Sequence, residues 1–198
     1  MSETGSVKFK CEQLPIEIRQ FAGFDELNQA RGKLIELKLV GVDANGIGFG
    51  NLSVRDGESS RFYITGSGTG SLPELSPADY ARVVAYDFAR GWIRCEGTRI
   101  ASSESLTHAA VYESDPSIGA VIHCHHAGLW KRLRNTMPTT PAYAEYGTPE
   151  MAFAVKQLFN TTDVRPRKMF VMAAHPSGLV SFGSDPDEAL MVIVGAME

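Results

Sequence analysis

Apolar residues recur at helical spacing in several stretches of this chain. Leu27, Ala30 and Leu34 lie three or four positions apart, as on one buried face of a helix. They predict a helix over residues 24–40, in which Asp25 can serve as the N-terminal cap. The same kind of pattern predicts further helices over residues 103–114, 127–134, 148–160 and from about Pro186 to the end.

Other stretches are short, apolar or alternating, and bounded by turn residues, which is typical of strands. They predict strands over residues 51–55, 61–65, 82–88, 92–96, 119–125, 168–174 and 178–182. Glycine-rich loops occupy residues 41–50 and 66–71. The strands gather in the first half and again near the end, with helices between them. This order favours an α/β (α+β) fold, a three-layer α/β/α sandwich around a central, mainly antiparallel sheet.

Three of the five histidines lie in one tetrapeptide, His123-Cys124-His125-His126, at the end of a predicted strand. Alternation along a strand turns His123 and His125 to the same face and Cys124 to the other. His175 follows a second predicted strand and is well placed as a third imidazole. A His-x-His pair on a strand also occurs without a metal. The pair alone therefore leaves a metal site and a pair of structural histidines equally open.

The composition fits a single globular domain. The chain has 198 residues, of which 43% are hydrophobic and 21% charged. We expect one domain over residues 24–198, with residues 1–23 packing on it as an N-terminal extension. The net charge of −4 argues against a nucleic-acid surface. No apolar stretch is long enough to span a bilayer, which argues against a membrane partner.

The number and spacing of the cysteines indicate the cellular compartment of the protein. Cys11, Cys95 and Cys124 are odd in number, widely spaced and without a C-x-x-C pair. This pattern favours free thiols in a reducing cytosol and excludes a structural zinc knuckle. The first residues lack the charged and apolar regions of a secretory signal. We therefore expect a cytoplasmic protein.

Five short motifs follow one another along the chain, and together they are specific. They are Gly50-Asn51-Leu52-Ser53-Val54-Arg55, Ile64-Thr65-Gly66-Ser67-Gly68, Ser102-Ser103-Glu104 with His108, His123-x-His125, and His175. With these motifs the chain resembles the class II aldolase/adducin family over roughly residues 25–195. The resemblance implies the three-layer fold expected above. It also implies a homotetramer with its sites at subunit interfaces.

The resemblance makes His123, His125 and His175 the ligands of one zinc ion per chain, and Glu104 the catalytic acid/base. Three imidazoles suit a borderline divalent ion and leave a position open for substrate, although other divalent metals could use the same ligands. The metal would stabilise an ene-diolate as a carbon–carbon bond of a small ketose breaks. Glu104 would move a proton on or off the enolate carbon. The plainer interpretation of Glu104 is a first-turn carboxylate that the helix dipole favours.

The resemblance also implies a site for the substrate's phosphate. Its residues would be Asn51, Ser67, Gly68, Ser102 and Ser103. Amide N–H groups and hydroxyls at glycine-rich turns and at a helix start suit an oxyanion. The alternatives are that the glycines serve turn geometry only and that one of the paired serines is a plain helix cap.

Some positions depart from the family pattern. Gly48 stands where the aldolase has a threonine that helps to hold phosphate. The segment before Tyr146 is short and lacks the insertion that carries a catalytic tyrosine. Neither Tyr143 nor Tyr146 can be assigned that role from the sequence. The metal half of the site is thus intact, whereas the choice of substrate stays open.

Three classes of function remain. The first is a zinc-dependent aldehyde-lyase of aldolase type in carbohydrate metabolism, acting on a small phosphorylated or carboxylated ketose. The second is a dehydratase or epimerase of sugar phosphates on the same metal site, although the epimerases typically have aspartate in place of Glu104. The third is a non-catalytic binding module like adducin, against which the complete set of histidines counts. A nucleophilic Cys124 is disfavoured, because strand alternation turns it away from the histidines.

Overall fold

The computed structural model of the chain describes residues 9–198. An eight-stranded sheet runs through this part of the molecule in the order β1-β7-β6-β5-β4-β8-β10-β9. Its strands are β1 (Lys10–Leu14), β4 (Asn51–Arg55), β5 (Phe62–Thr65), β6 (Tyr80–Asp87), β7 (Trp92–Glu96), β8 (Ala120–His125), β9 (Met169–Val171) and β10 (Gly178–Gly183). Within it, β1 runs parallel to β7, and the other neighbouring pairs are antiparallel. The prediction of a mainly antiparallel sheet is confirmed.

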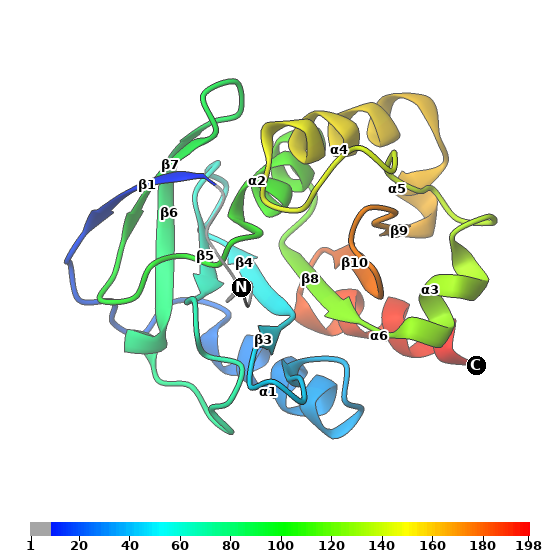
Figure 1. Ribbon diagram of the computed structural model, residues 1–198. Helices are drawn as coiled ribbons and strands as arrows, with labels where there is room; N and C mark the ends of the chain where they lie inside the picture. Colours follow the sequence, from blue (N-terminus) through cyan, green and yellow to red (C-terminus); the bar gives the residue numbers. More distant parts are fainter. Residues whose placement is uncertain (1–8) are drawn as a thin grey trace.

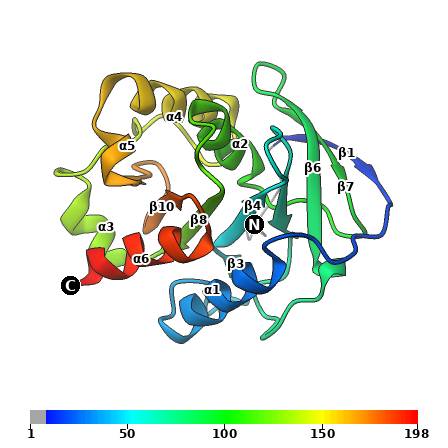
Figure 2. The same ribbon diagram turned by 180° about the vertical axis from the view of Figure 1, so that it is seen from behind.

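Helices cover both faces of this sheet. They are α1 (Phe24–Glu36), α2 (Ser105–Ser114), α3 (Ala127–Leu133), α4 (Pro149–Thr161), α5 (Val164–Arg167) and α6 (Pro186–Met197), with a 3₁₀ turn η1 (Pro77–Asp79). Figure 1 shows α2 and α4 along the upper side of the sheet and α1 and α6 along the lower side, and Figure 2 shows the same layers from behind. The three-layer α/β/α arrangement is therefore as predicted.

Each face of the sheet has its own apolar core, and β8 shows how one strand serves both. Val121 belongs to the core under α2 and α4, whereas Ile122 and Cys124 belong to the core over α1 and α6. All three side chains are fully buried. The alternation predicted for His123 to His125 thus holds, and it places the imidazoles on the α2 side.

Some boundaries differ from the predicted ones for local reasons. Helix α1 ends at Glu36 rather than near residue 40, because Lys38 adopts a left-handed φ of 58° and the Leu39 N–H turns back to the Leu34 carbonyl at 2.8 Å. Asp25 does not cap this helix. The cap position belongs to Gly23, and Asp25 lies in the first turn.

The sequence pattern missed several short elements or misjudged their length. The loop predicted over residues 41–50 contains a small hairpin of β2 (Gly41–Val42) and β3 (Gly48–Phe49). Strand β9 is three residues long, so that His175 lies in a turn between β9 and β10. Strand β1 and helix α5 were not predicted at all.

The N-terminal segment contributes to the sheet where the structure describes it. Strand β1 adds to the edge at β7, and Phe9 is buried in the α2-side core. Residues 1–8, which we expected to belong to the same extension, lie outside the described residues.

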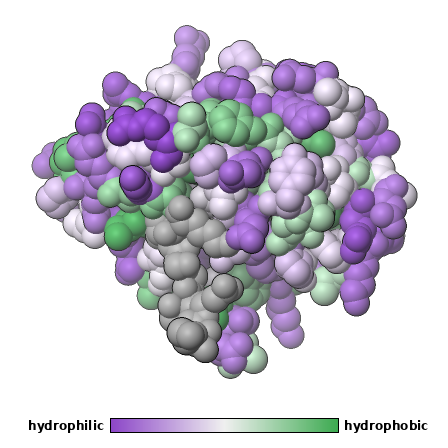
Figure 3. All heavy atoms as spheres, turned by 45° about the horizontal axis from the view of Figure 1, so that its top comes forward, coloured by the Kyte–Doolittle hydropathy of each residue, from purple (hydrophilic) through white to green (hydrophobic). Residues whose placement is uncertain are grey.

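Hydrophilic and apolar side chains share the surface on the side of α4. This surface is largely hydrophilic, with apolar side chains in small separate patches (Figure 3). Within residues 9–198, no helix is both long and apolar enough to cross a membrane.

Candidate active site

Three histidines converge at one end of the central strands. His123 and His125 project from β8, and His175 lies in the turn that leads into β10. The Nε2 atom of His125 lies 3.2 Å from Nε2 of His123 and 2.8 Å from Nε2 of His175. Two nitrogen ligands of a tetrahedral zinc ion lie about 3.3 Å apart. The three imidazoles therefore fit a single metal ion, and no other such group of ligands occurs among residues 9–198.

The protonation of the two strand histidines also suits a metal. Burial, with the neighbouring imidazoles, holds the pKa of His123 well below its usual value, and burial lowers the pKa of His125 to about 4. Both rings are thus neutral near pH 7. His123 Nδ1 lies 3.1 Å from the Leu179 carbonyl, which only accepts, so Nδ1 carries the proton. The lone pair of His123 is left on Nε2, on the side of the other histidines.

The turn that carries His175 depends on a glycine. The Gly178 N–H donates to the His175 carbonyl at 2.8 Å, and His175 N–H donates to the Met172 carbonyl. A Cβ atom on Gly178 would lie 2.5 Å from Cδ2 of the His175 ring. Since Gly178 pairs with His125 across the two strands, its small size brings the second and third imidazoles together.

Glu104 lies beside the histidines on the wall of the same cavity. It occupies the N-cap position of α2, is only 2% exposed, and accepts a hydrogen bond at Oε2 from Thr107 Oγ1 at 2.8 Å. Its side chain does not cap the helix. Neither paired serine occupies the N-cap position, although the Ser102 hydroxyl accepts the Glu104 N–H at 3.4 Å just before the helix. A buried carboxylate in a polar cavity is a candidate for proton transfer.

All the residues predicted to bind phosphate lie on the wall of this cavity, whose volume is about 440 Å³. Asn51 comes from the start of β4, Ser67 and Gly68 from the loop after β5, and Ser102 and Ser103 from the turn before α2. The two loops meet because Gly66 bridges to Ala101 and the Ser67 N–H donates to the Ile100 carbonyl at 2.8 Å.

Asn51 is the clearest sign of a missing partner. It is 6% exposed, and its buried Oδ1 finds no hydrogen-bond partner among residues 9–198. It pairs with His123 across β4 and β8, directly beside the candidate metal ligands. Gly50 precedes it with a φ of 77°, and a Cβ there would lie 2.7 Å from Val40 Cγ2. A buried unsatisfied amide oxygen at a cavity wall points to a ligand or ordered water.

The structure also brings in residues whose roles the sequence left unassigned. The Tyr146 ring packs on His175 with centroids 4.5 Å apart and lines the cavity, whereas Tyr143 is 70% exposed. The Phe49 ring stacks on His125 at 5.2 Å. Asp43 and Asn45 of the β2–β3 hairpin lie on the cavity wall. No spacing rule links these residues to the histidines, and only the folded hairpin and turn bring them there.

The other two histidines have structural roles. His126 caps α3 by accepting the Leu129 N–H at Nδ1, 3.0 Å away. His108 is buried on α2, where its Nδ1 lies 2.7 Å from Ser53 Oγ. Cys124 is buried in the opposite core, and burial raises its pKa to about 12. Cys124 therefore cannot form a nucleophilic pair with a histidine, because it lies on the other face of the sheet and its thiol stays protonated near pH 7.

Comparison with known proteins agrees with this fold. The class II aldolase and adducin N-terminal domain matches residues 38–197. The chain therefore belongs to the class II aldolase/adducin family. Among solved structures it is similar to an L-fuculose 1-phosphate aldolase, at 22% identity and a TM-score of 0.66 over 90% of this chain and 84% of that one.

Two further structures are similar. One is YgbL from Klebsiella pneumoniae, described as a putative aldolase/epimerase/decarboxylase, at 21% identity and a TM-score of 0.65 over 87% of this chain and 84% of that one. The other is the L-fuculose-1-phosphate aldolase from Thermus thermophilus, at 21% identity and a TM-score of 0.56 over 88% of this chain and 86% of that one. At these identities the likeness shows the shared fold.

Proposed function

We propose that the protein is a metal-dependent lyase of class II aldolase type, which cleaves or forms a carbon–carbon bond in a small, phosphorylated ketose. The observation that carries the proposal is the convergence of three imidazoles beside a buried carboxylate on one cavity wall. Family membership and the fold shared with L-fuculose 1-phosphate aldolase support it.

In this proposal His123, His125 and His175 hold one zinc ion per chain, as the default metal for a three-imidazole site. A bound zinc ion would supply a Lewis acid for charge that develops on substrate oxygens. The hydrogen bond from His123 Nδ1 to Leu179 keeps this ring oriented, and the Phe49 ring restricts rotation of His125.

Glu104 is the acid/base that moves a proton at the substrate carbon released by bond cleavage. Thr107 donates to Oε2 and so fixes the direction of the carboxylate. For bond formation, we propose that the Tyr146 hydroxyl donates a proton to the aldehyde oxygen, which becomes a hydroxyl, and that cleavage returns this proton to Tyr146, because this ring packs on His175 and lines the cavity.

In this proposal the substrate's phosphate lies at the glycine-rich loop after β5 and the turn before α2, on the wall of the same cavity. Asn51, Ser67, Gly68, Ser102 and Ser103 would bind it with amide and hydroxyl donors. No lysine or arginine side chain lies on the cavity wall among the described residues, so binding relies on oriented donors rather than on direct ion pairs.

A dehydratase or epimerase of sugar phosphates on the same metal site is the alternative. It is kept because the same metal and the same acid/base can serve water loss or inversion, and because a fold relative is itself described as aldolase, epimerase or decarboxylase. An adducin-like binding module without catalysis is the remaining hypothesis, and the intact histidine cluster counts against it. We further propose a cytoplasmic homotetramer, as the family resemblance implies.

The experiment that decides among these reactions is a panel of phosphorylated ketoses incubated with the zinc-loaded protein. Aldehyde release, water loss and inversion are scored separately by NMR. Aldehyde release that requires both the metal and Glu104 supports the lyase. Water loss or inversion without cleavage would replace it by the alternative, and no reaction on any substrate would favour the binding module.

A further inference from the structure

The loop between β5 and η1 forms one wall of the cavity through Gly66 to Gly70. Within residues 9–198, the N–H groups of Gly68, Thr69 and Gly70 donate to no backbone acceptor. Gly68 has a φ of 78°, and a Cβ there would meet nothing within 4 Å. The loop therefore offers free amide donors at an open place on the cavity wall.

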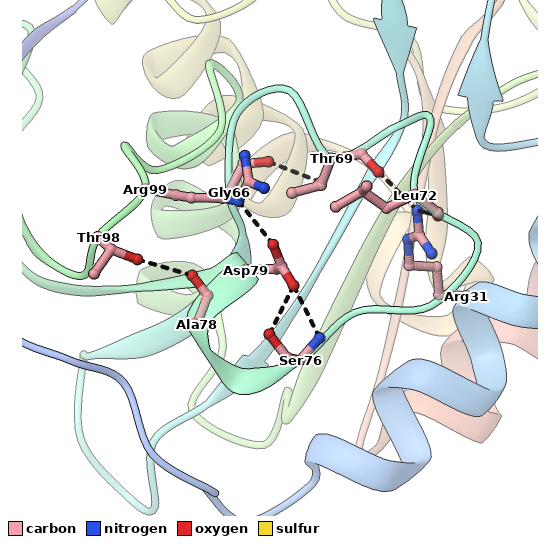
Figure 4. A network of polar contacts seen from close by, with 9 residues as sticks. All are labelled: Arg31, Gly66, Thr69, Leu72, Ser76, Ala78, Asp79, Thr98 and Arg99. Carbon is pink, nitrogen blue, oxygen red and sulfur yellow. Dashed lines mark hydrogen bonds and ion pairs between the residues drawn. The ribbon is translucent and has the colours of Figure 1, made fainter.

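A single buried arginine holds this loop from behind. Arg31, on α1, is 2% exposed and lies outside the cavity wall. One of its terminal nitrogens donates to the carbonyls of Thr69 at 2.9 Å and Leu72 at 2.7 Å, and the other donates to Pro73 at 3.3 Å. Figure 4 shows the guanidinium reaching from the helix to the underside of the loop.

The near end of the loop is fixed separately. The Gly66 N–H donates to the Asp79 carbonyl at 2.8 Å, and Thr69 Oγ1 donates to the Gly66 carbonyl at 2.8 Å. The Asp79 carboxylate is in turn held by Ser76 and Arg99 (Figure 4). The far end, at Thr69 to Pro73, depends on Arg31.

The geometry points to Arg31 as a positioning residue for binding of the substrate's phosphate. In a planar trans peptide, the carbonyl of one residue and the N–H of the next point in opposite directions. Because Arg31 binds the Thr69 carbonyl, it turns the Gly70 N–H away from the helix. Its buried positive charge also lies behind a wall that has no cationic side chain of its own among the described residues. Arg31 thus favours an anion without touching it.

This inference rests on the proposed phosphate site, and inorganic phosphate is the probe that tests it. Calorimetry on the zinc-loaded protein is expected to show that Arg31→Met weakens phosphate binding by about tenfold or more, which corresponds to at least about 1.4 kcal/mol. Arg31→Lys should restore part of the affinity, because one ammonium keeps the charge but cannot reach three carbonyls in a fork. Metal content should be unchanged in both.

The matched control is Arg55→Met. Like Arg31, Arg55 donates to backbone carbonyls, in its case the four of Ser59, Tyr112, Asp115 and Ile118. Neither Arg55 nor any of these four residues lines the cavity. Arg55→Met should lower thermal stability without weakening phosphate binding. Equal weakening in both variants, or unchanged binding in Arg31→Met, would overturn the role of Arg31. If the wild type binds no phosphate at all, the proposed phosphate site fails instead.

Two further readouts keep the test decisive if Arg31→Met does not fold. In the wild type, a phosphate titration followed by amide NMR should shift Gly70 more than the amides of residues near Arg55. In Arg31→Lys, KM for a phosphorylated substrate should rise while kcat stays close to that of the wild type. Phosphate binding without a shift at Gly70, or a fall in kcat alone, would contradict the inference.

Discussion

Replacing Glu104 by glutamine tests the proposed chemistry with little change in shape. Loss of an acid/base group costs about 10²- to 10⁴-fold in turnover, or roughly 3 to 5 kcal/mol of activation free energy. The structural cost is smaller. The hydrogen bond from Thr107 loses its charged acceptor, which is worth about 1 kcal/mol, and removing a buried charge offsets part of this loss. For a chain of this length, about 1 kcal/mol shifts the unfolding temperature by roughly 2 to 4 °C.

The assay compares Glu104→Gln with the wild type in retro-aldol cleavage, metal content and thermal unfolding. Turnover should collapse while metal content and unfolding temperature stay close to the wild-type values. Glu113→Gln is the matched control, since Glu113 lies on the same helix but on the surface, paired with Lys156. An undiminished cleavage rate in Glu104→Gln would refute the assigned role. A loss of activity that merely follows unfolding or loss of metal would refute it as well.

Two other changes probe the surroundings of the site. Tyr146→Phe keeps the ring on His175 but removes the hydroxyl, so turnover should fall by roughly a hundredfold while the metal is retained. Tyr143→Phe, at an exposed position, should have no effect on turnover. Equal rates in both variants would exclude Tyr146 as proton donor. Burial lowers the pKa of His108 from 6.5 to about 3, so between these values the unfolded chain binds a proton that the folded chain does not. Stability should therefore fall with falling pH in this window, with His108 contributing about 1.4 kcal/mol per pH unit, and urea titrations of wild type and His108→Gln should differ by that slope. Parallel slopes would contradict the burial of a neutral His108.

The site was predictable to the extent that it depends on local pattern. Alternation on one strand was sufficient to place His123 and His125 together and to separate Cys124 from them. The place of His175 beside them was expected from its position after a strand and from the family resemblance. Its actual approach depends on Gly178, whose missing Cβ makes room for the ring.

What the sequence could not predict depends on tertiary contacts. Strand β1 is short and mixed in polarity, and it forms a strand because β7 offers a free edge. The Phe49 ring reaches His125 through a two-residue strand that no periodicity reveals. Arg31 looks like one charged residue on an amphipathic helix, and its burial becomes evident only when the loop of Thr69 folds over it.

The central claim is that the three histidines hold a metal ion, and its most direct test is mass spectrometry of untagged protein purified without chelator. The wild type should contain about one zinc ion per chain. His125→Ala should lose it, whereas His126→Ala, which removes the adjacent imidazole that caps α3, should retain it. No metal in the wild type, or equal metal in the wild type and His125→Ala, would mean that this cluster is not the metal site.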